Sequence, residues 1–268
     1  MSTHEPLADR DGTSTPDTGA GGPSRSAAVP ATTAPGRSWL PRSTAGQLFV
    51  AALCLLLLAL VNTWVAQPFA IPSQSMENTL RVGDRVVVNK LAYRFGGHVR
   101  RGDVVVFDGR GSFLSDDAAG PTGVGGALRQ LGSYLGLAAP TENDYVKRVI
   151  GVGGDRVVCC DTEGRITVDG VPLEESAYLF PGDDASSVPF DVQVPAGKLF
   201  MMGDHRSDSR DSRAHLGEPG GGFVPEEKVI GRADWVVYPI GHWRHLRRPG
   251  TFGAVDAAGR SGRHGDQR

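Results

Sequence analysis

The sequence predicts a mainly β protein, with an antiparallel β domain that follows a single N-terminal transmembrane helix. Three observations support this fold class: an apolar run near the N-terminus, short Val-rich segments separated by turn residues, and a high content of glycine and proline, 37 and 18 of 268 residues. Short apolar segments with frequent turns are typical of a β-sandwich or barrel. The formal net charge of -2 gives no indication of a polyanion-binding protein.

Residues 1–42 are predicted to form a disordered cytoplasmic tail. Pro, Gly, Ser, Thr and Ala dominate this segment, and almost no large apolar residue precedes Trp39. Such a composition cannot bury enough surface to offset the entropy lost on ordering. Acidic and basic residues are balanced in the tail, so we expect no nucleic-acid binding there.

Residues 43–66 are predicted to form the transmembrane helix. The apolar core Leu48–Val61 lies within an uncharged stretch long enough to provide the ~20 residues of a membrane span. Arg37 and Arg42 precede the span, and no basic residue follows it until Arg81. This charge asymmetry predicts a cytoplasmic N-terminus and an extracytoplasmic domain.

Two alternatives to a membrane anchor are a cleaved secretory signal and a buried core helix. Cleavage requires small residues at positions -3 and -1. Ala66 has Trp64 two positions before it and Ala70 has Pro68, so neither position fits. The leucine-rich run has no polar face, which disfavours a core helix in a globular domain.

The predicted extracytoplasmic β domain covers residues 67–243. Its candidate strands are Val-rich and short, and turn residues separate them. They comprise residues 84–90, 102–107, 145–152, 155–160, 165–170, 190–195, 198–204 and 233–240.

Two segments depart from the strand pattern. Residues 108–143 form a Gly/Ala-rich insertion whose many glycines make a stable helix unfavourable. Residues 244–268 begin with basic residues and continue at low complexity, and we expect them to be a disordered C-terminal tail.

The three cysteines define no metal or redox motif. Cys54 lies in the apolar run, and Cys159 and Cys160 are adjacent. Neighbouring cysteines rarely form a disulfide with each other because the resulting ring is strained. No CxxC pair is present, so neither a zinc ribbon nor a thioredoxin-type site is predicted, and the redox state of the adjacent pair stays open.

Three polar segments beside candidate strands could carry chemistry. The first, residues 70–80, places Ser73 and Ser75 just beyond the membrane span, and the second places Lys147 on a Val-rich strand. A lysine on a buried face loses its charge more easily, which suits a general base. The third, residues 202–213, alternates Asp, Arg and Ser. Each segment alone also fits an ordinary turn or a solvated strand edge.

Taken together and in order, these segments resemble the bacterial type I signal peptidase family. The resemblance rests on four boxes after the membrane span: PSQSMENTL at 72–80, RGDVVVF at 101–107, YVKRVIGVGGD at 145–155 and GDHRSDSRDSR at 203–213. It covers residues 45 to 240, and the combination of boxes, their order and their distance from the span is very specific.

The resemblance implies an antiparallel β catalytic domain with a serine/lysine dyad. Ser75 would attack the scissile carbonyl, and Lys147 would take the Ser75 proton and later pass it to the leaving amine. The Ser75 N–H and the Ser73 hydroxyl would hold the oxyanion. The implied supporting residues are Ser209 as a hydrogen-bond partner of Lys147, an ion network of Asp211 with Arg148 and Arg213, and Asp204 as a residue that positions the same loop. Met76, Leu80 and Tyr145 would lie near the substrate groove.

The resemblance also implies a substrate, a set of partners and a location in the plasma membrane. The substrate would be the signal peptide of an exported preprotein, bound as an added strand with small residues at -3 and -1. The lipid bilayer and a functional link to the secretion translocon would complete the list of partners, and no metal or cofactor is implied. A related Ser/Lys protease acting on itself or on a regulatory partner, or a β domain that binds signal peptides without cutting them, are the competing functions.

Two positions depart from the family pattern. Asn78 replaces the proline of the serine box, and His205 replaces the asparagine of the last box. His205 raises the alternative of a Ser75–His205–Asp204 triad. Adjacent residues normally point apart, so Asp204 is poorly placed to orient His205.

Overall fold

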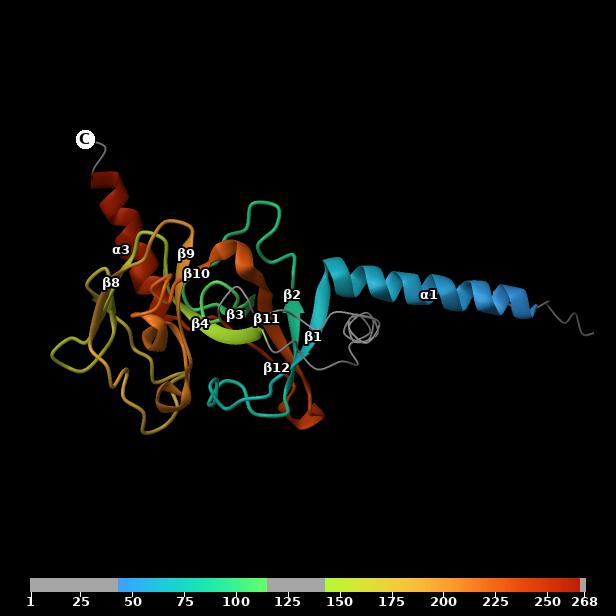
Figure 1. Ribbon diagram of the computed structural model, residues 1–268, viewed down its shortest axis with the longest axis horizontal. Coiled ribbons are helices and arrows are strands. Elements are labelled where there is room, and N and C mark those ends of the chain that lie inside the picture. The colour runs from blue at the N-terminus through green and yellow to red at the C-terminus, as the bar shows by residue number, and fades with distance from the viewer. Residues whose placement is uncertain (1–42, 115–142, 266–268) are drawn as a thin grey trace, which may run out of the picture.

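The computed structural model describes residues 43–114 and 143–265. Helix α1 (Thr44–Trp64) projects as a single rod from a β-rich body, and only its C-terminal end reaches that body (Figure 1). No residue of α1 is buried, and it is the one helix among the described residues that is long and apolar enough to cross a membrane. The observed bounds lie within the predicted span of 43–66.

The C-terminal end of α1 is joined firmly to the sheet. Strand β1 (Ala66–Ala70) begins only two residues after Trp64. The Lys90 amine donates to the carbonyls of Asn62 and Thr63 at 3.0 and 3.4 Å, and the Arg94 guanidinium lies 5.2 Å from the Trp64 ring centroid. A cation at the carboxyl end of a helix satisfies carbonyls that have no partner within the helix.

An eight-stranded antiparallel sheet forms the larger part of the body. Its order is β1, β2 (Arg85–Asn89), β11 (Val229–Tyr238), β3 (Val104–Asp108), β4 (Asp144–Val152), β9 (Lys198–Met202) and β10 (Val224–Pro225), and β12 (Arg244–His245) pairs with β11. Two register shifts interrupt the pairing of β11 with β2, and another interrupts the pairing of β4 with β9. Such bulges bend strands and help a sheet to curve around a core.

A smaller four-stranded sheet lies at the end of the body away from α1 (Figure 1). Its order is β7 (Val171–Pro172), β6 (Thr167–Val168), β5 (Arg156–Cys159) and β8 (Phe190–Gln193). Short 3-10 turns connect the later strands: η1 (Arg206–Asp208), η2 (Ser212–His215), η3 (Glu226–Lys228) and η4 (Ile240–His242). Helix α3 (Thr251–Gly265) ends the described chain.

The predicted mainly β class is confirmed, and each of the eight predicted segments contains a strand. The Val-rich pattern succeeded because these strands pack apolar side chains on at least one face: Val86, Val88, Val105 and Val106 are all fully buried. The predicted disordered tail at 1–42 and most of the predicted insertion at 108–143 lie outside the described residues. Of the insertion, Asp108 ends β3, and the next few residues form a turn that buries Phe113.

The prediction of a disordered tail over residues 244–268 is wrong for its described part, residues 244–265. His245 and Arg244 pair with β11, and α3 places Phe252 and Val255 at 0% and 1% exposure in the core. The Phe252 ring stacks on Tyr178 at 6.1 Å, and Asp256 forms ion pairs with Arg101 and Arg248. Two apolar residues three positions apart are enough to dock a helix, although the segment around them is rich in Gly and Ala.

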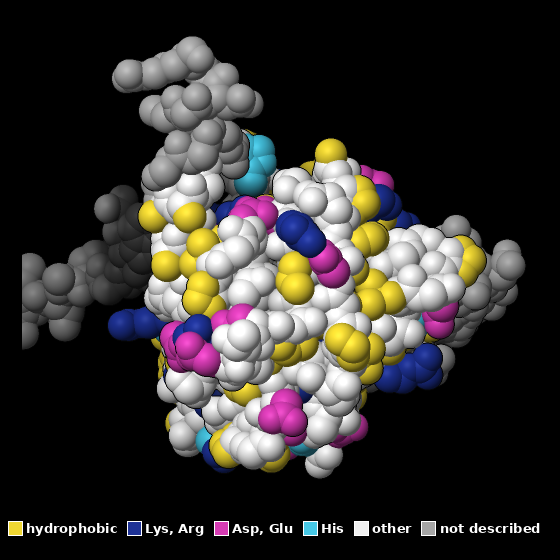
Figure 2. Space-filling model, turned by 90° about the vertical axis from the view of Figure 1, so that its left-hand side faces the viewer, with side chains coloured by type: hydrophobic (Ala, Val, Ile, Leu, Met, Phe, Trp, Pro, Cys, Tyr) yellow, Lys and Arg dark blue, Asp and Glu magenta, His cyan; other side chains and the backbone are white. Residues whose placement is uncertain are grey.

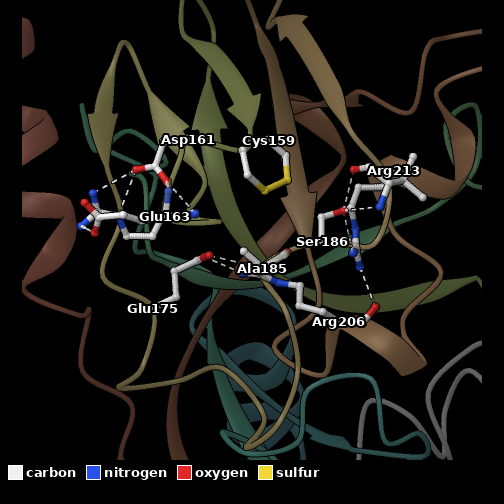
Figure 3. Close-up of a disulfide and its surroundings, with 11 residues drawn as sticks. Cys159, Asp161, Glu163, Glu175, Ala185, Ser186, Arg206 and Arg213 are labelled. Atoms are coloured by element: carbon white, nitrogen blue, oxygen red, sulfur yellow. Dashed lines mark hydrogen bonds and ion pairs between the residues drawn. A yellow bond between two sulfur atoms is a disulfide. The ribbon is translucent and has the colours of Figure 1, made fainter.

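The structure answers the question that the sequence left open about the adjacent cysteines. Cys159 and Cys160 form a disulfide at the end of β5 (Figure 3). The peptide bond between them is cis, and their Cα atoms lie 2.9 Å apart. Cys159 is buried in the core of the smaller sheet, while Cys160 is exposed.

Candidate active site

Ser75 and Lys147 meet in a buried site between the end of β1 and strand β4. Lys147 Nζ donates to Ser75 Oγ at 2.5 Å, and the Ser73 hydroxyl lies 3.4 Å from the same oxygen. Ser75 is 8% exposed and Lys147 is 3% exposed. The fold therefore brings together a hydroxyl and an amine that are 72 residues apart in the chain.

Burial changes the acid–base chemistry of the Lys147 amine. Removal from water disfavours the charged form and lowers the pKa of Lys147 to about 8, although the carboxylates of Asp211 and Asp204 oppose the shift. An amine with a pKa this close to neutrality is uncharged in a substantial fraction of molecules at mildly alkaline pH. The site therefore has a hydroxyl and a competent base within one hydrogen bond.

The loop after β9 supports the Ser75 segment from the other side. The backbone N–H of His205 donates to the Ser75 carbonyl at 3.2 Å, and the Gly203 N–H donates to Asp211 at 2.9 Å. A Cβ at Gly203 would collide with the Ser209 side chain and with the Ser75 carbonyl oxygen. Only glycine allows the two segments to approach so closely.

The supporting ion network differs from the predicted one. Arg148 does not pair with Asp211: it makes a two-pronged contact with Asp204 at 2.8 and 2.6 Å, while Asp211 pairs with Arg213 at 2.8 Å. Successive residues on a strand point to opposite faces, so Arg148 faces away from its neighbour Lys147 and meets a different carboxylate. The result is two separate buried pairs instead of one network.

Ser209 does not make the predicted hydrogen bond with Lys147. Its hydroxyl is buried near the Asp211 carboxylate, whose pKa it helps to lower, and the Lys147 amine donates to Ser75 instead. Burial alone would raise the pKa of Asp211, but the hydrogen bond and charge of Arg213 hold it below its ordinary value. This carboxylate therefore remains ionised close to the Lys147 amine.

A cavity of about 210 Å³ opens beside the dyad. Met76 and Tyr145 line it, as predicted for a substrate groove, whereas Leu80 packs fully buried in the core and is not among the lining residues. The sequence analysis missed the other lining residues, which are Phe69, Ala70, Ile71, Pro72, Asp144 and Val146. The sequence could have indicated these residues, because they lie next to the candidate serine and lysine along the chain.

The alternative triad is not present in the described structure. The His205 ring stacks on Phe180 with centroids 3.9 Å apart, and its Nδ1 is buried without a partner among the described groups. The Asp204 carboxylate is occupied by Arg148 and by the Thr79 hydroxyl. Asp204 and His205 therefore form no pair that could activate Ser75.

Sequence reasoning also missed a second layer of buried ionic contacts. Arg206 donates to Glu175 at 3.1 Å and to the Ala185 carbonyl at 2.6 Å (Figure 3). The Tyr178 hydroxyl donates to Glu175 at 2.7 Å, and the Tyr178 ring lies 4.3 Å from the Arg148 guanidinium. These contacts tie the segment before β8 to the loop that supports Ser75.

Comparison with known proteins assigns this arrangement to a family. The family described as "Signal peptidase, peptidase S26" matches residues 43–238. A signal peptidase I from Mycobacterium tuberculosis is 40% identical over 232 residues, covering 77% of this chain and 76% of the relative. A signal peptidase I from Leptolyngbya laminosa is 35% identical over 192 residues (72% and 78%), and one from Haemophilus influenzae is 31% identical over 238 residues (66% and 64%).

The family match places this chain, with its apolar helix and β domain, among the membrane-associated peptidases. The chain belongs to the signal peptidase family, peptidase S26, and is a signal peptidase hydrolase. The family resemblance stated from the sequence boxes is thereby confirmed.

Proposed function

We propose that the protein is a serine endopeptidase that cuts N-terminal signal peptides from exported preproteins with a Ser75/Lys147 dyad. The observation that carries this proposal is the 2.5 Å hydrogen bond between Lys147 Nζ and Ser75 Oγ inside a buried site. A β domain that only binds signal peptides would not need an amine with a lowered pKa in contact with a hydroxyl.

The proposed reaction begins with the uncharged Lys147 amine. The amine accepts the Ser75 proton as Oγ attacks the scissile carbonyl, and the resulting oxyanion is held by the Ser75 N–H and the Ser73 hydroxyl. Lys147 then gives its proton to the leaving amine of the mature protein. Water attacks the acyl-serine with Lys147 again as base, which releases the signal peptide and restores Ser75.

The groove supports binding of an extended peptide. Its walls come from residues 69–73 at the end of β1 and residues 144–147 of β4, so a substrate strand can lie between two backbone segments. Alternate side chains of that strand would face the protein. Ile71 and Val146 line the cavity on either side of the dyad, and we propose that they contact the small side chains of a small-x-small sequence.

The membrane placement is the second part of the proposal. We place α1 across the plasma membrane, with the N-terminus in the cytoplasm and the β domain outside, because basic residues precede the helix. The substrate's own apolar segment would share the bilayer with α1. Preproteins would be delivered after translocation, which gives the functional link to the translocon.

The decisive experiment incubates the purified full-length protein in detergent with a preprotein and sequences the new N-terminus. Ser75→Ala and Lys147→Ala should each reduce cleavage by at least about 10³-fold, because each removes a member of the dyad. Ser207→Ala is a matched control on an exposed serine and should cleave at the wild-type rate. Wild-type rates in Lys147→Ala, together with a loss of activity in His205→Ala, would refute the dyad.

A further inference from the structure

A cavity on the opposite side of β4 from Lys147 is unusually basic. It has a volume of about 340 Å³. Among the described residues its lining contains no carboxylate but includes Arg81, Arg148, Arg244, Arg247 and Arg248, of which Arg148 and Arg248 pair with Asp204 and Asp256 outside the lining. Guanidinium groups stay charged at all physiological pH values, so their mutual repulsion favours an anion between them.

Three of these arginines form no ion pair with a described residue. Arg247 makes no side-chain hydrogen bond within the described chain, Arg81 approaches only His242 at 3.4 Å, and Arg244 donates to the Thr79 carbonyl. The positive charge of these three side chains is therefore available to a ligand. In a basic patch with interspersed carboxylates, ion pairs would leave less positive charge for an anionic ligand.

The inner wall of the cavity is rigid and buried. Arg148, at 2% exposure, is fixed by Asp204, by the Gly102 carbonyl at 2.9 Å and by the Thr79 hydroxyl at 3.1 Å. Arg248 is likewise held by Asp256 at 2.6 Å. These two arginines are therefore paired with carboxylates and form a rigid wall, and the unpaired Arg81, Arg244 and Arg247 provide the charge for a bound phosphate.

The surroundings of the cavity distinguish it from other charged parts of the surface. The end of the molecule opposite α1 shows basic and acidic side chains scattered beside one another (Figure 2). Around the arginine cavity, by contrast, the residues adjacent in sequence to Arg81 and Arg244 include the exposed apolar side chains Val82 and Trp243, at 52% and 64% exposure. An exposed tryptophan beside arginines is typical of a surface that meets lipid headgroups.

We propose that this arginine cavity, formed by Arg81, Arg148, Arg244, Arg247 and Arg248, binds the phosphate of an anionic ligand, with an anionic phospholipid headgroup as its natural source. The site is separate from the groove that holds Ser75 and Lys147, because Arg148 faces away from Lys147 on β4. A bound headgroup would attach the β domain to the bilayer at a point distant in sequence from α1.

The test measures thermal unfolding of the full-length protein in detergent micelles by tryptophan fluorescence. The micelles carry no lipid, phosphatidylcholine or phosphatidylglycerol, and a separate arm adds inorganic phosphate without lipid. Phosphatidylglycerol should raise the unfolding temperature of the wild type by on the order of a few degrees, because a ligand that binds only the folded state stabilises it. Phosphatidylcholine, whose headgroup has no net charge, should not.

Variants separate the site from general charge attraction. Arg81→Gln/Arg247→Gln should lose the shift, and Arg156→Gln/Arg165→Gln, which removes equal charge elsewhere, should keep it. If the double variant folds poorly, Arg247→Gln alone provides the test. Its side chain has no described partner, and this variant should also lose the shift in unfolding temperature.

The two arms identify the source of the phosphate. A shift with phosphatidylglycerol alone supports the lipid headgroup, and an equal shift with inorganic phosphate supports a soluble phosphate ligand at the same cavity. No shift in either arm, or an equal shift in Arg247→Gln, would overturn the proposal. None of these outcomes depends on cleavage by Ser75, so the phosphate-binding proposal can be refuted without affecting the proposed peptidase function.

Discussion

Lys147 and Arg148 are neighbours on β4 that point to opposite faces and contact different partners. Lys147 contacts the Ser75 hydroxyl in a dry environment that lowers its pKa, whereas Arg148 remains charged because it is paired with Asp204. Strand alternation allows one dipeptide to place the proposed base beside Ser75 and to anchor the loop behind it. Exchange of the two residues would place a permanent charge against Ser75.

The pH dependence of cleavage should report the Lys147 amine. The amine acts as a base only when it is uncharged, so the rate should rise about tenfold per pH unit below its pKa and level off above about pH 8. The measurement is the single-turnover rate of preprotein cleavage as a function of pH. A rate that stayed constant across this limb would exclude Lys147 as the base.

The meeting of Ser75 and Lys147 could be predicted because each lies in a box whose residues and order are specific. The partner of Arg148 could not, because Asp204 and Asp211 both lie in the same polar segment and only the packed loop selects between them. The sequence could not exclude the predicted Ser209–Lys147 hydrogen bond for the same reason, because Ser209 lies in this polar segment too. Sequence indicates which groups are near one another, but a rotation of one side chain decides which hydrogen bond forms.

At the scale of elements, α3 shows how few residues can dock a helix. Phe252 fits beneath Gly102, where a Cβ would collide with its ring, and stacks on Tyr178. The low-complexity sequence around it suggested disorder, since composition averages over the segment and hides a single buried pair. The Val-rich strands were easier to predict because their pattern repeats across several residues.

Phe252→Ala should lower the free energy of unfolding by about 3–5 kcal/mol, because it removes a fully buried aromatic side chain and leaves a cavity. The measurement is denaturant unfolding of the full-length protein in detergent. Phe95→Ala is the matched control, at 94% exposure, and should change stability by less than about 0.5 kcal/mol. Equal effects of the two substitutions would show that α3 is not docked in solution.

At the scale of the whole molecule, orientation across the bilayer can be tested directly. A protease added to intact cells stripped of their wall should digest the region after residue 70, because the proposed topology places the β domain outside. The digestion is followed by immunoblotting against the β domain, with lysed cells as the control. Complete protection in intact cells, with digestion after lysis, would reverse the proposed orientation.

The near-absence of a linker between α1 and β1 has a geometric consequence. Only Val65 separates the helix from the first strand, and β1 advances by about 16 Å before the chain turns toward Ser75. With α1 across the bilayer as proposed, so short a connection would hold Ser75 at a fixed distance from the lipid, and the enzyme would select scissile bonds by their distance from the membrane. Scissile bonds at one fixed height would be cut, and those displaced up or down by a few residues would be spared.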